Sequence, residues 1–318
     1  MGKIMIAFGP VPSRRLGKSL GINMIPPSHC TYSCIYCQLR RTRHMSSTQG
    51  HWYDTKDVVE AVAAKLEMAK ESGISVDWLS FVPEGEPTLE RCIGEQIDGV
   101  KSLGVRVAVI TNASLLWKSE VRKAIGNADL VSVKIDTVAE QSWKRIARPH
   151  GELRLDSVLD GIGRFSCDYD GILLTETMLV AGINDAVEAI ISTTDFIKAV
   201  KPQKSYIAVP VRPPAETWVK HASEYKVGLT YHLLHESGIN TELLVGYEGN
   251  EFQHTGNIER DLLSITAVHP MREDAVEEFL KETGGGTVLL DWLLREGKLV
   301  ENEYGGNRFY LRSLERWE

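Results

Sequence analysis

Short apolar runs alternate with amphipathic segments along residues 20 to 245. The runs at 20–25, 77–82, 105–111, 130–136, 172–179 and 204–209 have the length and composition of strands. Between them, apolar residues recur at helical spacing at 55–72, 88–103, 117–126, 152–166, 185–200 and 218–237. Because strands and helices alternate regularly, we predict a parallel sheet with helices packed outside it.

The polar positions of the strands indicate where a ligand would bind. Six strand–helix units fit either a doubly wound sheet or an open barrel, and in both folds ligands gather at the carboxyl ends of the strands. In 130–136, Ser132, Lys134 and Asp136 share one face, and the alternate positions are apolar. A filled barrel would carry apolar side chains inside, so a polar inner face favours a barrel that holds a large ligand.

The pattern changes after residue 245. Residues 246–257 are rich in glycine and polar side chains, which is typical of a linker. Short helices are then expected to about residue 296, followed by strands at 298–303 and 308–311 around Gly305-Gly306. We therefore divide the chain into a barrel domain at 1–245, the linker, and a winged-helix-like domain at 258–318. The expected core of the last domain is apolar and comprises Leu262, Leu263, Val276, Phe279, Leu280, Leu289, Leu290, Leu293 and Leu294.

Charge is distributed unevenly over the 318 residues. The chain has 36 basic and 43 acidic residues, yet the first 53 contain seven basic residues and no acidic one. An anion site there would use arginines suited to phosphate or carboxylate, namely Arg14, Arg15, Arg40, Arg41 and Arg43; a solvated basic surface explains each of them equally well. Residues 258–318 hold 8 basic and 13 acidic residues, which disfavours general nucleic-acid binding by that domain.

The hydropathy pattern also bears on location. No apolar run reaches the ~18 residues that a membrane helix needs, and the first twelve residues lack the features of a signal peptide. We expect a cytoplasmic protein without membrane contact.

Three of the five cysteines lie within eight residues, in the spacing C-x3-C-x2-C of Cys30, Cys34 and Cys37. Three thiolates on one short loop can hold three corners of an iron–sulfur cluster. Alternatively they form a Cys3His zinc site with His29 or His44, in an interaction protein rather than an enzyme. Cys92 and Cys167 stand alone in helical segments, where buried small apolar residues are expected.

The cysteine loop resembles that of the radical S-adenosylmethionine (SAM) superfamily, with Tyr36 as the aromatic residue before the third cysteine. Further motifs resemble the branch of the tRNA wyosine-base synthases. They are the string from Gly9 to Gly17, Gly21-Ile-Asn23, Gly85-Glu-Pro-Thr-Leu89 and Thr111-Asn112. Glu84 stands where that superfamily usually has glycine.

The resemblance implies a partial (β/α)6 TIM-like barrel with one [4Fe-4S] cluster on Cys30, Cys34 and Cys37. It also implies that SAM chelates the open iron and is cleaved by one electron to a 5′-deoxyadenosyl radical, which abstracts hydrogen from a substrate. A flavodoxin- or ferredoxin-type protein is the expected electron donor. The residues expected around SAM are Tyr36 against the adenine, Gly85 and Glu86 at the ammonium, and Asn112, Ser132 and Asp136 at the ribose or carboxylate.

The likeness does not extend to the substrate. Archaeal wyosine synthases carry a second cluster on three further cysteines, whereas only Cys92 and Cys167 remain here. We therefore expect a different reaction from wyosine formation, most plausibly on an RNA base, because of the branch and the basic first segment. A peptide or protein recruited by the acidic C-terminal domain is the alternative substrate.

Overall fold

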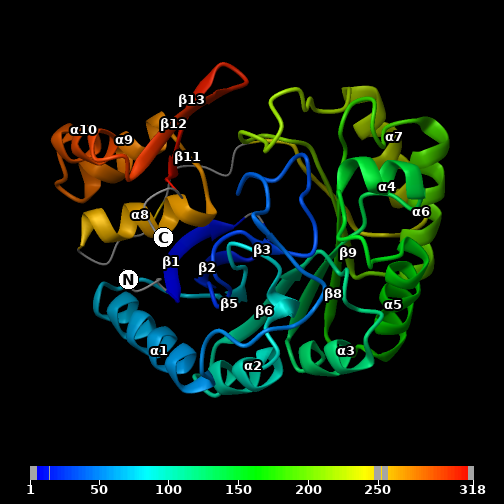
Figure 1. Cartoon of the computed structure of the whole chain (residues 1–318), viewed down its shortest axis with the longest axis horizontal. Helices are drawn as coiled ribbons and strands as arrows, with labels where there is room; N and C mark the ends of the chain where they lie inside the picture. The colour runs from blue at the N-terminus through cyan, green and yellow to red at the C-terminus, as the bar shows by residue number, and fades with distance from the viewer. Residues whose placement is uncertain (1–5, 14, 247–251, 253–256, 314–318) are drawn as a thin grey trace.

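The computed structural model describes residues 6–13, 15–246, 252 and 257–313 of the chain. Its centre is an eight-stranded sheet that curls into an open half-barrel with helices along the outside (Figure 1). The strand order is β1-β2-β5-β6-β7-β8-β9-β10, and only β1 runs antiparallel to its neighbour. The strands are β1 (Ala7–Ser13), β2 (Gly17–Ile22), β5 (Trp78–Phe81), β6 (Arg106–Thr111), β7 (Leu130–Lys134), β8 (Ile172–Met178), β9 (Lys204–Ala208) and β10 (Thr241–Leu244). The predicted α/β partial barrel is confirmed.

Each outer helix buries one apolar stripe against the sheet. In α1, Val58, Val62 and Ala69 recur at helical spacing on the buried face, and the helix ends before Gly73, which adopts a positive φ of 69°. The barrel helices are α1 (Thr55–Glu71), α2 (Ile93–Lys101), α3 (Ser119–Ile125), α4 (Glu140–Ile146), α5 (Leu155–Asp168), α6 (Val187–Val200) and α7 (Glu224–His235). Six of these seven match predicted segments.

The sequence did not predict β1, α4 or β10, nor the two-residue strands β3 (His29–Cys30), β4 (His44–Met45) and β11 (Met271–Arg272). The strand β1 contains Pro10 and Pro12, which the sheet tolerates because β1 is its antiparallel edge. The helix α4 has only seven residues and buries Trp143 and Ile146, too few for a recognisable stripe. The strand β10 has four residues and closes the opposite edge.

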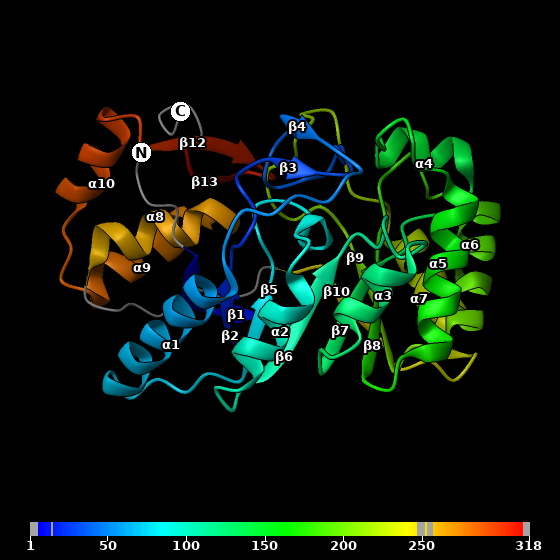
Figure 2. The same cartoon turned by 60° about the horizontal axis from the view of Figure 1, so that its bottom comes forward.

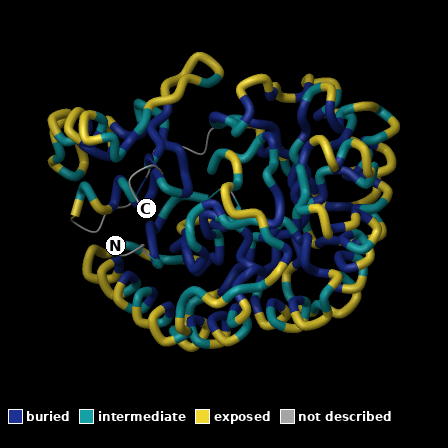
Figure 3. Tube along the Cα trace, in the orientation of Figure 1, coloured by how far each residue is buried: buried dark blue, intermediate teal, exposed yellow. Residues whose placement is uncertain are grey.

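The strands of the half-barrel are mostly buried (Figure 3), and the side chains inside it form two parts. Toward the amino ends of the strands it is filled by apolar side chains that include Trp78, Leu130 and Tyr206. Toward the carboxyl ends it carries the charged Lys134, Asp136 and Glu176. The expected polar inner face is thus restricted to the carboxyl end of the strands.

The C-terminal module, residues 257–313, follows the barrel. It consists of α8 (Ile258–Val268), β11 (Met271–Arg272), α9 (Glu273–Glu282), α10 (Thr287–Arg295), β12 (Leu299–Tyr304) and β13 (Asn307–Arg312). Gly305 and Gly306, both at positive φ, form the hairpin turn. Its core contains Leu262, Val276, Phe279, Leu280, Leu290 and Leu293, while Leu263, Leu289 and Leu294 are partly buried around it. The order of helices and hairpin is the predicted one.

The module packs against the barrel through α8, which lies beside β1 and near α1 (Figures 1 and 2). Of the predicted linker 246–257, only Gly246, Phe252 and Asn257 belong to the described residues, and Phe252 is buried in the core of the module. Among the described residues, every helix is too short or too polar to cross a bilayer.

Candidate active site

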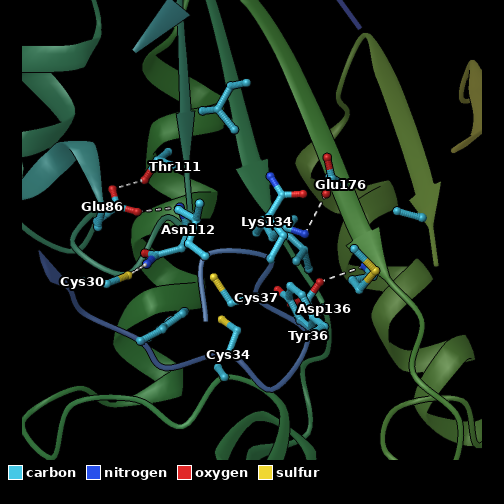
Figure 4. A pocket seen from close by; sticks show the side chains of 18 of the residues that line it. Cys30, Cys34, Tyr36, Cys37, Glu86, Thr111, Asn112, Lys134, Asp136 and Glu176 are labelled. Atoms are coloured by element: carbon cyan, nitrogen blue, oxygen red, sulfur yellow. Dashed lines mark hydrogen bonds and ion pairs between the residues drawn. The ribbon is translucent and has the colours of Figure 1, made fainter. Parts of the chain in front are cut away.

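A cavity of about 300 Å³ opens at the carboxyl ends of the strands. The cysteine loop between β2 and α1 forms one wall, and the ends of β5 to β9 form the others (Figure 4). Eight of the nine predicted cluster and SAM residues line it, and they are Cys30, Cys34, Cys37, Tyr36, Gly85, Glu86, Asn112 and Asp136. The ninth, Ser132, is buried on the same face of β7 as Lys134, but it is not among the residues that line the cavity.

Backbone hydrogen bonds hold the cysteine loop in place. The amides of Ser33 and Ile35 donate to the carbonyls of Ala147 and Ile146 at 3.0 Å, directly after α4. The Ile35 side chain is fully buried, so the loop is anchored by its apolar residue while Cys34, Tyr36 and Cys37 face the cavity. All three thiols are free and partly buried. Burial, followed by the nearby Glu86 charge, raises the pKa of Cys30 to about 12, and burial also raises the pKa values of Cys34 and Cys37.

The spacing of the sulfurs bears on the alternative of a single zinc ion. A tetrahedral zinc with Zn–S bonds of about 2.3 Å places its sulfurs about 3.8 Å apart. Within the described part of the chain, only His51, Glu90 and Cys92 bring three potential ligand atoms within 4.8 Å of one another. His29 stacks on His44 with ring centroids 4.4 Å apart, and its Nδ1 contacts the carbonyls of Pro26 and Pro27. The three thiols are therefore not drawn together in the described structure as the ligands of one zinc ion would be.

Glu86 is buried and accepts four hydrogen bonds. Its Oε1 accepts from the hydroxyls of Thr88 and Thr111, at 2.7 and 2.6 Å, and from the Thr88 amide, and its Oε2 accepts from the Asn112 amide at 2.8 Å. Burial raises the pKa of Glu86, and these hydrogen bonds counter part of that effect. The carboxylate therefore ties the end of β6 to the loop after β5 while it remains on the cavity wall.

Asn112 lies between Glu86 and the cysteine loop. Its side-chain amide donates to the Thr31 hydroxyl at 2.8 Å and to the Cys30 sulfur at 3.5 Å, and its oxygen accepts from the Ser114 amide. The amide orientation is fixed on both sides. Asn112 can therefore donate to a thiolate at Cys30, and such second-shell bonds tune a metal site.

Charged side chains form the wall opposite Cys30. Lys134 Nζ contacts Glu176 Oε1 at 2.7 Å and lies 4.7 Å from the centre of the Tyr36 ring. Glu176 also accepts from Arg15, and Asp136 accepts from the Tyr36 hydroxyl and the Met178 amide. Lys134 thus pairs with Glu176 on the neighbouring strand and not with Asp136, which shares its strand face.

The charges of this wall reinforce one another. Burial would lower the pKa of Lys134, but the carboxylates of Glu176 and Asp136 outweigh it and raise that pKa above its ordinary value. Burial raises the pKa of Asp136, while the Lys134 charge and the Tyr36 hydroxyl oppose the shift. Lys134 therefore stays positively charged beside Cys34 and Cys37. Its charge acts to lower the pKa values of both thiols, against the effect of burial.

Comparison with known proteins places this constellation in a family. The sequence model described as the Radical SAM superfamily matches residues 24–193, which include the cysteine loop and the ends of β5, β6 and β7. The chain belongs to the radical SAM superfamily. Consequently it is a radical SAM enzyme, and the superfamily implies both SAM and an iron–sulfur cluster. The alternative of a zinc-structured interaction protein is set aside.

One curated relative matches almost the entire chain. The UPF0026 protein MJ1312 of Methanocaldococcus jannaschii is 41% identical over 311 residues, which cover 97% of this chain and 96% of the relative. Solved structures share the fold at low identity. A radical SAM methyltransferase from Sphaerobacter thermophilus has a TM-score of 0.55 at 12% identity, covering 71% of this chain and 66% of that one. TYW1 with a lysine-pyruvate adduct bound has a TM-score of 0.53 at 16% identity, covering 70% and 75%.

The four described arginines of the basic segment are not gathered at one anion site. Arg15 lines the cavity and pairs with Glu176. Arg41 pairs with Glu216, as does Arg148, and the Arg41 side chain is 69% exposed. Arg40 is partly buried at a narrow space near Glu84, and Arg43 is exposed. Arg14 lies outside the described residues.

Glu84, which stands where the superfamily usually has glycine, is buried and pairs with Arg312 of the C-terminal module. Cys167 is exposed on α5 and Cys92 is half-buried at the start of α2, so the expectation of buried apolar cysteines is wrong for Cys167. The radical SAM cavity also contains Glu176, which sequence reasoning missed. Its signal was a single carboxylate on a face of β8 whose other members, Ile172, Leu174 and Met178, are apolar.

Proposed function

We propose that the enzyme holds a [4Fe-4S] cluster on Cys30, Cys34 and Cys37 and modifies an RNA base by radical chemistry. The observation that supports the cluster is that three free thiols face one cavity in a chain that belongs to the radical SAM superfamily. When bound, the cluster and SAM supply one-electron cleavage of the sulfonium to methionine and a 5′-deoxyadenosyl radical that abstracts hydrogen from the substrate.

The chain's own residues have separate tasks in this proposal. Glu86 lines the cavity, and its Oε2 accepts one hydrogen bond among the described residues, so this oxygen has capacity for the SAM ammonium. Lys134 provides the cation for the methionyl carboxylate, a role that sequence reasoning did not give it. Asn112 and Asp136 remain on the wall for the ribose, and the Tyr36 ring, held by its hydroxyl on Asp136, offers a face to the adenine.

The surroundings of the cavity mouth support an RNA substrate. Basic residues occur in segments that adjoin cavity-lining residues in the sequence or pair with them. We call this set, together with Trp218, which is 50% exposed, the mouth rim; its basic members are Arg41, Arg43, Arg145, Arg148 and Lys220. The Glu216 amide donates to the Ile35 carbonyl, which brings the Trp218 segment onto the cysteine loop. Basic side chains beside an exposed aromatic suit a phosphate backbone and an unstacked base.

The test begins with anaerobic reconstitution of the full chain. We expect about four iron and four sulfide per chain, and 5′-deoxyadenosine after reduction with SAM. A flavodoxin- or ferredoxin-type protein is the proposed physiological donor and replaces the chemical reductant in a second series. Reactions with pools of cellular RNA and of cellular protein are then read by mass spectrometry. A new mass in the RNA pool supports the proposal, whereas one in the protein pool supports the alternative peptide or protein substrate.

Cysteine variants separate the cluster ligands from the other thiols. Cys34→Ala should lose iron and 5′-deoxyadenosine formation together, because the loop then has two ligands. Cys167→Ala is the matched control, since it removes an exposed cysteine on α5 that lies outside the cavity. Undiminished 5′-deoxyadenosine from Cys34→Ala would refute the assignment.

A further inference from the structure

The C-terminal module makes two contacts beside the cysteine loop. This arrangement suggests that the module has a role other than recruiting a substrate. One contact reaches the loop after β5, which carries Glu84, Gly85 and Glu86. The other reaches Gln38, the residue directly after Cys37. These two contacts enclose the segment that carries all three thiols.

The first contact is a buried ion pair. Arg312, the last residue of β13, donates to Glu84 Oε1 at 2.5 Å, and the two side chains are 9% and 3% exposed. Asn23 after β2 donates to the same oxygen at 3.0 Å and accepts from the Glu84 amide. A carboxylate in such a place must keep its partners, because an unpaired buried charge is strongly unfavourable.

Glu84 is directly connected to the backbone that precedes Cys30. Its carbonyl accepts from the Ser28 amide at 2.9 Å, and the Glu86 amide donates to the His29 carbonyl at 3.0 Å. Any displacement of Glu84 therefore moves residues 28 and 29 and, with them, Cys30.

The second contact is a polar chain on the Cys37 side. Gln38 donates to the Val268 carbonyl at 2.8 Å and accepts from Arg212 at 2.9 Å. Arg212 lines the cavity, and its other guanidinium nitrogen lies 2.9 Å from Nε2 of the buried His269. The end of α8 and the residue after it thus support the cysteine loop from the opposite side.

We infer that the C-terminal module is a structural part of the active site, and that Arg312, through Glu84, and Gln38 are positioning residues for the cysteine loop. Arg312 does not line the cavity, whereas Gln38 lies on its wall directly after Cys37; in this inference both fix the backbone on either side of the three thiols. The expected effects on the cluster and on SAM binding rest on the proposed function. The ordering of the loop by the module holds for the chain alone.

A second ion pair between barrel and module provides a matched control. Lys65 on α1 and Asp261 on α8 lie 3.1 Å apart with side chains 8% and 3% exposed, and neither lines the cavity. Both pairs are buried and both join the module to the barrel. Only the Arg312–Glu84 pair adjoins the cysteine loop.

Hydrogen–deuterium exchange on the full chain without cluster tests the positioning directly. In Arg312→Gln and Gln38→Ala, amides in 28–46 and 84–90 should exchange about tenfold faster or more, whereas Lys65→Gln should leave those segments unchanged. Arg312→Lys retains the charge and should restore most of the protection; it also serves if Arg312→Gln does not fold. The inference would be overturned if the amides of 28–46 and 84–90 exchanged at equal rates in Arg312→Gln, Gln38→Ala and Lys65→Gln.

The reconstituted protein provides an independent measurement. Arg312→Gln should change the electron paramagnetic resonance spectrum of the reduced cluster and weaken SAM binding by about 10- to 100-fold, the range for residues that orient metal ligands. If exchange increases but no cluster forms even in the unaltered chain, the proposed function fails and the positioning stands. If the cluster forms and neither exchange nor spectrum responds to Arg312→Gln, the positioning fails and the function stands.

Discussion

At the scale of single residues, the sequence did not predict which charged side chains pair with each other. Lys134 and Glu176 lie on neighbouring strands, and Glu84 and Arg312 are 228 positions apart. Strand alternation predicted which residues of β7 face inward, because the period of two is local. It could not predict the partner of each charge, since that depends on register and on how the module packs.

The role of Lys134 gives a prediction at this scale. Lys134→Met should weaken SAM binding by about 10- to 100-fold, because a hydrogen bond to a charged group contributes roughly 1.5–3 kcal/mol. Glu176 keeps Arg15 as a partner in this variant. Isothermal titration of the reconstituted protein measures the effect, and iron content should be unchanged.

The control is Lys118→Met. Lys118 contacts the Ser47 carbonyl outside the cavity, so its replacement should leave SAM affinity at the original value. Equal affinity of the Lys134→Met and Lys118→Met proteins would contradict the role given to Lys134.

At the scale of elements, hydrophobic periodicity was sufficient for the long helices and the central strands. The predicted six strands correspond to β2, β5, β6, β7, β8 and β9, with ends that differ by a few residues. The short or proline-containing elements β1, α4 and β10 lack the repeated pattern on which such predictions depend. Residues 218–223, predicted as the first turns of this helix, precede α7 instead, and His221 among them forms an antiparallel bridge with Val180.

The loop after β5 allows a prediction about its glycine. A Cβ at Gly85 would lie 1.9 Å from the His29 carbonyl oxygen, which is backbone that precedes Cys30. Gly85→Ala should therefore destabilise the chain by roughly 1–3 kcal/mol, seen as a lower denaturant midpoint. It should also displace the cysteine loop and reduce the iron content after reconstitution.

Gly163→Ala is the corresponding control. Gly163 lies within α5 with no neighbouring atom within 4 Å of an added Cβ. Alanine there should raise the midpoint slightly, because glycine costs a helix about 1 kcal/mol relative to alanine. Unchanged stability and iron content in Gly85→Ala would show that the loop has more room than the structure gives it.

At the scale of the whole molecule, charge distribution leads to the last prediction. The chain is net −7, yet its first 53 residues hold seven basic side chains and no acidic one, whereas residues 258–318 hold 8 basic and 13 acidic ones. The module is joined to the site through buried side chains, and its acidity disfavours RNA binding there. An RNA substrate should therefore contact the mouth rim, and its affinity should fall steeply as salt increases. For three to five phosphate contacts to single-stranded RNA, log K against log salt should have a slope of about −2 to −3.5.

Variants of the rim locate those contacts. Arg43→Ala and Lys220→Ala should each make the slope shallower by about 0.7, measured by fluorescence anisotropy over a salt series. Arg164→Ala, which removes an exposed arginine on α5 that pairs with Asp160, should leave both slope and affinity unchanged. A slope near zero would rule out phosphate contacts and favour a protein substrate, because peptide recognition does not require the release of counterions from a phosphate backbone. If instead all three variants reduced the slope equally, RNA would be binding through general charge, and the rim would have no special role.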